Sequence, residues 1–136
     1  MLGKALEGVT VVEMGQAVAA PYCATQLAES GARVIKIERP GGDFARAYDD
    51  HLKGASVFFS WLNRGKESVE LDIKNPEDSA LLHRILDSAD VFIQNLAPGA
   101  AERAGFGSKE LRARNPRLIT CDITGYGDGG DYEKSK

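Results

Sequence analysis

Short hydrophobic runs of β type alternate along this chain with segments that have helical spacing. The β-type runs, which are rich in β-branched residues, cover residues 9–14, 33–38, 68–73, 91–94 and 118–123. Between the first two runs, small apolar residues recur from Ala20 to Ala28 at the i, i+3, i+4, i+7 and i+8 positions of one helical face. Strands that alternate with helices predict an α/β fold, in which a Rossmann-like, mostly parallel sheet carries helices on both faces.

The pattern ends on an unfinished βα unit. The fifth run is followed by a glycine-rich loop at residues 124–130 and by a short polar tail. We therefore expect the sheet to be incomplete at the C-terminus, and the pattern favours a fragment of something longer over a small complete domain with a frayed tail.

Turn and capping residues indicate where the helices begin and end. Pro21 suits the first position of a helix that ends at Gly31, and Asn75 is suited to cap a second helix. Ser108 is predicted to cap a third helix, from residue 109 to about residue 115. Two stretches have a weaker pattern: residues 39–54, predicted to be a long loop or a broken helix, and residues 57–62, a short apolar piece of either type.

Length and charge narrow the classes of function. The chain has 136 residues, enough for one domain, and its 17 basic and 20 acidic residues give a net charge of −3, which argues against nucleic acid as a partner. Cys23 and Cys121 lack the spacing of a metal or redox pair, so we expect two buried, reduced thiols and no metal site. No segment resembles a signal peptide or a membrane span, which predicts a cytoplasmic protein without a membrane partner.

In parallel α/β sheets, ligands bind beyond the carboxyl ends of the strands. This rule selects the loops that follow Met14, Glu38 and Gln94. The first loop consists of small residues and enters its helix without a capping side chain, so free backbone N–H groups are expected there. They can receive a phosphate or another polar group of a ligand, or be satisfied by water or a neighbouring loop.

Individual polar residues near these loops have two interpretations each. Arg39 can pair with a phosphate or remain a solvated surface charge, and Asn95 can bind an adenine edge or stabilise its own turn. Glu38 has the position of a ribose-binding acid, but the GxGxxG motif of dinucleotide-binding folds is missing. Four cations are candidates to converge on a polyphosphate: Arg39, Lys74, Arg103 and Lys136.

Candidates for catalysis are absent from the pattern. His51 and His83 are isolated, and His83 is predicted to lie on the polar surface of its helix. The serines have no partnered base, and the acids near Asp43 lack metal-ligand spacing. We therefore expect no catalytic residue within this chain.

Four stretches together resemble one protein family over almost the whole chain. They are LEGVTVVEMGQAVAAPYCATQLAESGARVIKIERPGGD, LNRGKESVELDIKNPED, ADVFIQNLAPGAAERAGFG and NPRLITCDITGYG. In their order and spacing they are similar to the N-terminal part of the family III CoA-transferases, whose members include formyl-CoA:oxalate transferases, carnitine CoA-transferases and α-methylacyl-CoA racemases.

The resemblance implies a function and a set of contacts. Members are longer proteins with a large Rossmann-like domain and a small domain, and two subunits interlock as a homodimer. They move CoA between an acyl-CoA thioester and a carboxylic acid through an aspartyl intermediate, so that CoA is a substrate and no cofactor is permanently bound. The CoA contacts that carry over to this sequence are Val18, Ala19, Arg39, Leu71, Asp72, Ile73, Lys74, Asn95, Leu96, Ala97, Arg103 and Lys136.

Two departures from the family pattern bear on the activity. Val18 stands where the formate and oxalate transferases have a glutamine, which argues against their substrate choice. The catalytic aspartate of the family lies downstream of Lys136, and the His-Asp pair of the racemases has no match. The alternatives are a racemase-type enzyme and a non-catalytic Rossmann-like module that binds NAD or ATP.

Overall fold

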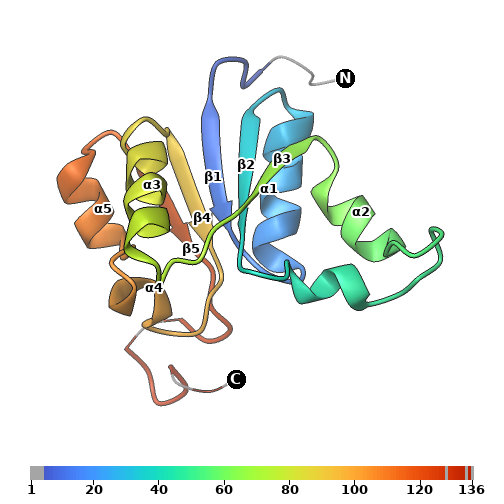
Figure 1. The fold of residues 1–136 in the computed structure, drawn as a ribbon. Helices are drawn as coiled ribbons and strands as arrows, with labels where there is room; N and C mark the ends of the chain where they lie inside the picture. The colour runs from blue at the N-terminus through green and yellow to red at the C-terminus, as the bar shows by residue number, and fades with distance from the viewer. Residues whose placement is uncertain (1–4, 128, 134, 136) are drawn as a thin grey trace.

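The computed structural model describes residues 5–127, 129–133 and 135, which contain one parallel sheet of five strands (Figure 1). Its order is β3-β2-β1-β4-β5. The direction of winding reverses between β1 and β4, which makes this the switch point at which ligands of such sheets bind. The strands are β1 (Thr10–Met14), β2 (Arg33–Glu38), β3 (Lys66–Glu70), β4 (Val91–Gln94) and β5 (Ile119–Asp122).

Helices cover both faces of the sheet, as predicted. One face carries the first α-helix and its neighbour α2, and the other carries the three later helices (Figure 1). The segment after β2 forms a short 3₁₀ helix, η1, on the side where the strands end (Figure 1). The helices are α1 (Ala19–Glu29), η1 (Phe44–Ala47), α2 (Val57–Asn63), α3 (Pro76–Asp87), α4 (Ala100–Arg103) and α5 (Ser108–Arg114).

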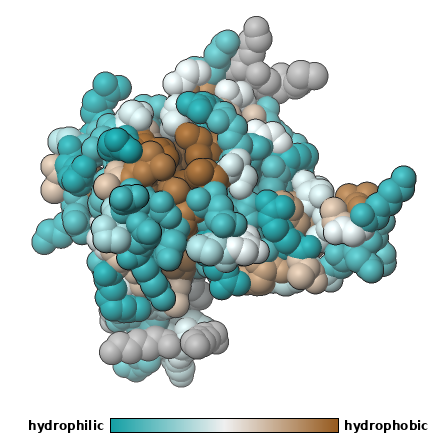
Figure 2. All heavy atoms as spheres, viewed as in Figure 1, coloured by the Kyte–Doolittle hydropathy of each residue, from teal (hydrophilic) through white to brown (hydrophobic). Residues whose placement is uncertain are grey.

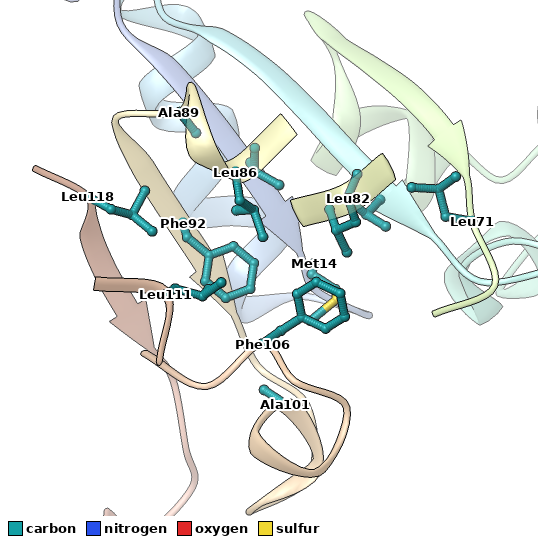
Figure 3. Packing of buried hydrophobic residues seen from close by; sticks show 12 residues of the cluster. Met14, Leu71, Leu82, Leu86, Ala89, Phe92, Ala101, Phe106, Leu111 and Leu118 are labelled. Carbon is teal, nitrogen blue, oxygen red and sulfur yellow. The ribbon is translucent and has the colours of Figure 1, made fainter. Parts of the chain in front are cut away.

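Alternation along the central strands divides the core into two clusters. Val11 and Ile93 face α1, whereas Val12 and Phe92 face α3 and α5. The α1 side is filled by small residues, above all Ala20 and Ala24, which let the helix lie close to the sheet. The other side contains larger groups that interdigitate around Phe92 (Figure 3): Met14, Leu82, Leu86, Phe106, Leu111 and Leu118.

The second face of the sheet is not fully covered near β2 and β3. Figure 2 shows apolar residues in a hollow on this face, ringed by hydrophilic ones. Ile35, Val69 and Ile85 line a depression of about 340 Å³ there, with the exposed pair Arg33 and Glu67 on its rim.

The predicted start of the first helix and both predicted ends of the third strand are wrong by two or three residues, since β3 begins at Lys66 and not at residue 68. The first helix begins at Ala19, so Pro21 occupies its third position, where a missing N–H still costs no intrahelical hydrogen bond. The third strand ends at Glu70, because Leu71 donates to Glu38 O as the last contact with β2 and the chain then turns at Asp72. The predicted strand had continued to residue 73.

The helix starts that differ from the prediction, or were left open by it, are explained by capping. Ser108 does not cap its helix, because its hydroxyl donates to Asp122 Oδ2 at 2.5 Å and Gly107 holds the capping position. Residues 57–62 are helical, since Ser56 Oγ accepts the hydrogen bond of Phe59 N and starts α2. Asn75 caps α3 as predicted, accepting from Glu77 N at 2.9 Å.

Candidate functional site

A groove opens at the carboxyl ends of β1, β2, β3 and β4. Its volume is about 390 Å³, within the range of small-molecule sites. We call it the strand-end groove; it is lined by Met14, Gly15, Gln16, Ile37, Glu38, Arg39, Pro40, Asp43, Leu71, Asp72, Ile73, Lys74 and Leu96.

Half of the twelve predicted CoA contacts line this groove. They come from three segments that are far apart in the sequence: Arg39 after β2, residues 71–74 after β3, and Leu96 after β4. Leu71 is buried, Ile73 and Leu96 are half-buried, and Arg39 and Lys74 are exposed. The lining therefore combines apolar walls with two cations at the solvent edge, which suits a ligand that has both an aromatic and an anionic part.

The other predicted contacts lie outside the lining. Val18 and Ala19 are exposed at the start of α1, two and three residues beyond the groove residue Gln16. Ala97 is exposed next to Leu96. Arg103 belongs to α4 and folds back over Gly99, where an added Cβ would come within 2.6 Å of its Nη1. Lys136 lies outside the described residues.

Asn95 ties the loops after β1 and β4 together. Its Oδ1 accepts a hydrogen bond from Gln16 N at 2.8 Å, and its Nδ2 donates to Gln16 O at 2.9 Å. Both ends of the amide are thus occupied by one backbone unit. Of the two interpretations of this residue, the structure supports stabilisation of the loops.

Arg39 is held in place without a carboxylate partner among the described residues. Its Nε donates to Gly42 O at 3.3 Å, and its guanidinium lies 5.8 Å from the ring centre of Phe44. The positive charge therefore stays available to an anion at the rim of the groove.

Glu38 is a groove residue whose carboxylate is already occupied. It accepts two hydrogen bonds from Arg46, at 2.6 and 2.8 Å, one from Ser68 Oγ at 2.5 Å and one from Asp43 N at 2.8 Å. Burial favours the neutral acid, but these hydrogen bonds outweigh it and lower the pKa of Glu38 to about 2. A carboxylate so engaged is not free to bind a ribose hydroxyl.

Beneath the groove lies a cluster that sequence reasoning missed. Glu13 and Lys36 are register partners on β1 and β2, and both are completely buried on the α1 side of the sheet. The Lys36 ammonium lies 3.2 Å from Glu13 Oε1 and 3.1 Å from Asp43 Oδ2, and Lys66 Nζ lies 3.1 Å from Glu13 Oε2. The available signal was a Glu and a Lys at inward positions of two otherwise apolar strands.

The surroundings of His83 and of the two cysteines do not favour catalysis. His83 was expected at the surface, but its ring stacks on Phe106 with 4.5 Å between ring centres, and its Nδ1 is buried. Cys23 and Cys121 are half-buried free thiols, and burial raises the pKa of Cys23, which disfavours the nucleophilic thiolate.

The described ranges, 5–127, 129–133 and 135, contain no group of three or more His, Cys, Asp or Glu side chains arranged to hold a metal ion. No helix there has the length and apolar character to cross a membrane.

Comparison with known proteins assigns the chain to a family. Residues 6–136 match the model of CoA-transferase family III. The chain is 40% identical to the succinyl-CoA–D-citramalate CoA-transferase of Chloroflexus aurantiacus over 129 residues, which are 93% of this chain and 32% of that protein. It is also 40% identical to the formyl-CoA:oxalate CoA-transferase of Afipia carboxidovorans over 130 residues, which are 94% of this chain and 31% of that enzyme.

A solved structure agrees with the fold. The crystal structure of a CaiB/BaiF family protein from Brucella suis superimposes with a TM-score of 0.92 at 36% identity, over 98% of this chain and 36% of that one. The chain spans about a third of the length of the curated relatives that it matches.

Proposed function

Because the chain belongs to CoA-transferase family III, we propose that it forms the CoA-binding part of an enzyme that transfers coenzyme A between an acyl-CoA thioester and a carboxylic acid. Residues 1–136 are then the N-terminal part of the large domain. The relatives named above act on succinyl-CoA and citramalate, or on formyl-CoA and oxalate, and they support an acyl-CoA and a carboxylic acid as the two substrates.

One observation carries the proposal. Three segments that contribute predicted CoA contacts are separated by more than twenty residues in the sequence, yet they line the same strand-end groove. The rule for parallel sheets selects the same edge without reference to any family.

The groove suggests a role for each side chain. Arg39 and Lys74 would pair with the phosphates of CoA, since guanidinium and ammonium groups at an exposed rim bind anions with little desolvation. Leu71, Ile73 and Leu96 would pack against the adenosine part. On the side of β1 and β4, CoA would be bordered by Val18, Ala19, Asn95 and Ala97. Further contacts would come from Asp72, Arg103 and Lys136.

The family resemblance assigns the chemical step to an aspartate that has no counterpart among residues 1–136. This aspartate would attack the acyl carbonyl and release the CoA thiolate. The thiolate would then attack the resulting anhydride and release the donor acid. The aspartyl thioester so formed would pass CoA to the acceptor acid by the same two steps in reverse. We further propose an interlocked homodimer that works in the cytoplasm.

Calorimetric titration with CoA tests the assignment of Arg39. The Arg39→Ala variant loses a charge-assisted contact, so its CoA affinity is expected to fall by about 1–3 kcal/mol, roughly five- to 150-fold. Arg33→Ala is the matched control, because it removes an equal charge from the opposite end of the same strand, where Arg33 pairs with Glu67. An unchanged dissociation constant for Arg39→Ala would contradict the assignment.

Thermal stabilisation separates CoA from other nucleotides. CoA and acetyl-CoA are expected to raise the melting temperature, while NAD and ATP at equal concentration leave it within error. Equal stabilisation by ATP would favour a general nucleotide-binding module instead.

A further inference from the structure

The cluster beneath the strand-end groove consists of four buried ionisable groups, which we call the buried charge network: Glu13, Lys36, Asp43 and Lys66. Each of these side chains is at most 1% exposed. Two carboxylates and two ammonium groups balance one another, so the network as a whole carries no net formal charge. Burial lowers the pKa of Lys66, and the neighbouring Glu13 acts in the opposite direction.

Four of the six other hydrogen bonds of these side chains go to the backbone of one segment, residues 15–21. The other two join Asp43 Oδ1 to Ala45 N at 2.9 Å and Lys66 Nζ to Asn63 Oδ1 at 3.0 Å. Glu13 Oε1 accepts from Gly15 N at 2.9 Å, and Lys36 Nζ donates to Gly15 O at 3.1 Å. Asp43 Oδ1 accepts from Ala17 N at 3.3 Å, and Lys66 Nζ donates to Pro21 O at 2.8 Å. The network therefore forms hydrogen bonds with the loop at its start, its middle and its end.

The shape of this loop needs such support. Ala17 has a φ of 58°, in the left-handed region, which costs a residue with a Cβ on the order of 1–2 kcal/mol. Gly15 has no room for a side chain, since an added Cβ would come within 2.4 Å of Ala20 Cβ and 2.6 Å of Glu13 Oε1. Gly15 and Gln16 line the groove, so the loop conformation decides the shape of one wall.

The network is a costly way to gain stability alone. Desolvating four charges offsets most of their mutual attraction, and apolar residues of similar volume often stabilise a core as well or better. Asp43 Oδ2 illustrates the cost, because it lies 3.1 Å from Lys36 Nζ but accepts no well-aligned hydrogen bond from the described residues. Charged groups give each contact a fixed direction, whereas apolar groups do not.

We propose that the buried charge network positions residues 15–21 for ligand binding, with Asp43 holding Ala17 in its left-handed conformation. Asp43 is then a positioning residue of the strand-end groove. The proposal deepens the proposed function, on which its ligand, CoA, rests.

Removal of the Asp43 carboxylate tests this role against a merely structural one. Asp43→Ala is expected to weaken CoA binding at least tenfold in calorimetry, under conditions where denaturant melts show the variant to be folded. Leu111→Ala is the control, because it destabilises the opposite core, where Leu111 is 2% exposed, without touching the loop. If Leu111→Ala weakens CoA binding as much as Asp43→Ala does, general destabilisation explains both effects and the proposal fails.

A second substitution tests the mechanism itself. Glycine adopts a positive φ without a steric penalty, so Ala17→Gly in the Asp43→Ala background is expected to recover at least threefold in CoA affinity. A double variant that binds CoA no better than Asp43→Ala would show that Asp43 does not act through the conformation of Ala17.

Amide hydrogen exchange of the unaltered protein requires neither a variant nor CoA. The N–H groups of Gly15 and Ala17 are expected to exchange at least tenfold more slowly than that of Ala19, which has no acceptor among the described residues. Equal exchange at Ala17 and Ala19 would overturn the positioning role. If the unaltered protein shows this protection but binds no CoA, the proposed function fails and the positioning role stands.

Discussion

The face of the sheet beneath α3, α4 and α5 is packed by large apolar side chains, whereas the face beneath α1 combines small residues with buried charges. Phe92 and Phe106 are completely buried in the first cluster. Glu13 and Lys36 are almost completely buried on the face beneath α1. Apolar packing is strong but has no preferred direction, while ion pairs and hydrogen bonds have strict geometry. The difference suggests that one face mainly stabilises the domain and the other mainly shapes the loops of the groove.

Truncation in the apolar cluster is expected to have the largest effect on stability. Phe92→Ala removes a completely buried ring and leaves a cavity, so the free energy of unfolding is expected to fall by about 3–5 kcal/mol in urea titrations. The CoA affinity of the folded fraction is expected to stay within twofold. A large loss of CoA affinity would contradict the division of roles between the two faces.

Loss of one charge from the other face is expected to cost somewhat less stability. Lys36→Met leaves Asp43 without its charged partner while Glu13 keeps Lys66, so we expect a loss of about 3 kcal/mol. Adding Asp43→Asn removes the uncompensated charge as well. The double variant is therefore expected to be at least ~1 kcal/mol more stable than the sum of the single effects predicts, and strict additivity would argue against a coupled network.

Acid is expected to weaken the charged face before the apolar one. The pKa of Glu38 is about 2 in the folded protein, below its ordinary value of 4.5, so its contribution is complete above pH 4.5 and is lost as the pH falls to 2. Because the partner Arg46 is half-exposed, we expect a contribution of about 2 kcal/mol. Urea titrations at pH 5, 3.5 and 2 measure it: the stability difference between the protein and Glu38→Gln is expected to shrink along this series. A difference that is independent of pH would contradict the assigned pKa.

The smallest expected effect concerns the start of α3, on the apolar face. Asn75→Ala removes the side-chain acceptor for Glu77 N, which is expected to lower the free energy of unfolding by about 1 kcal/mol. Asn75→Asp keeps an acceptor and serves as the control. Thermal melts of the two variants that coincide would show that capping does not limit the stability of this face.

Much of the fold follows from local patterns, and the site follows only in part. The strand pattern and the capping residue Asn75 predicted the parallel sheet and α3, because both depend on neighbours within a few positions. The role of Ser108 was mispredicted, since its hydroxyl bonds to Asp122, a partner on β5 that local sequence does not reveal. His83 was placed at the surface for a similar reason, because Phe106 covers its ring from another segment.

The sequence by itself determined the alternation of strands and helices, the edge of the sheet at which a ligand is expected, and the cations Arg39 and Lys74 at that edge. These features depend on residue spacing and on the handedness of the chain, which are local properties. Only the tertiary structure decided that Glu13, Lys36 and Asp43 meet beneath the first loop. Their contacts require β1 and β2 to pair in one register and the segment after β2 to fold back, and such contacts between distant residues leave no periodic trace in the sequence.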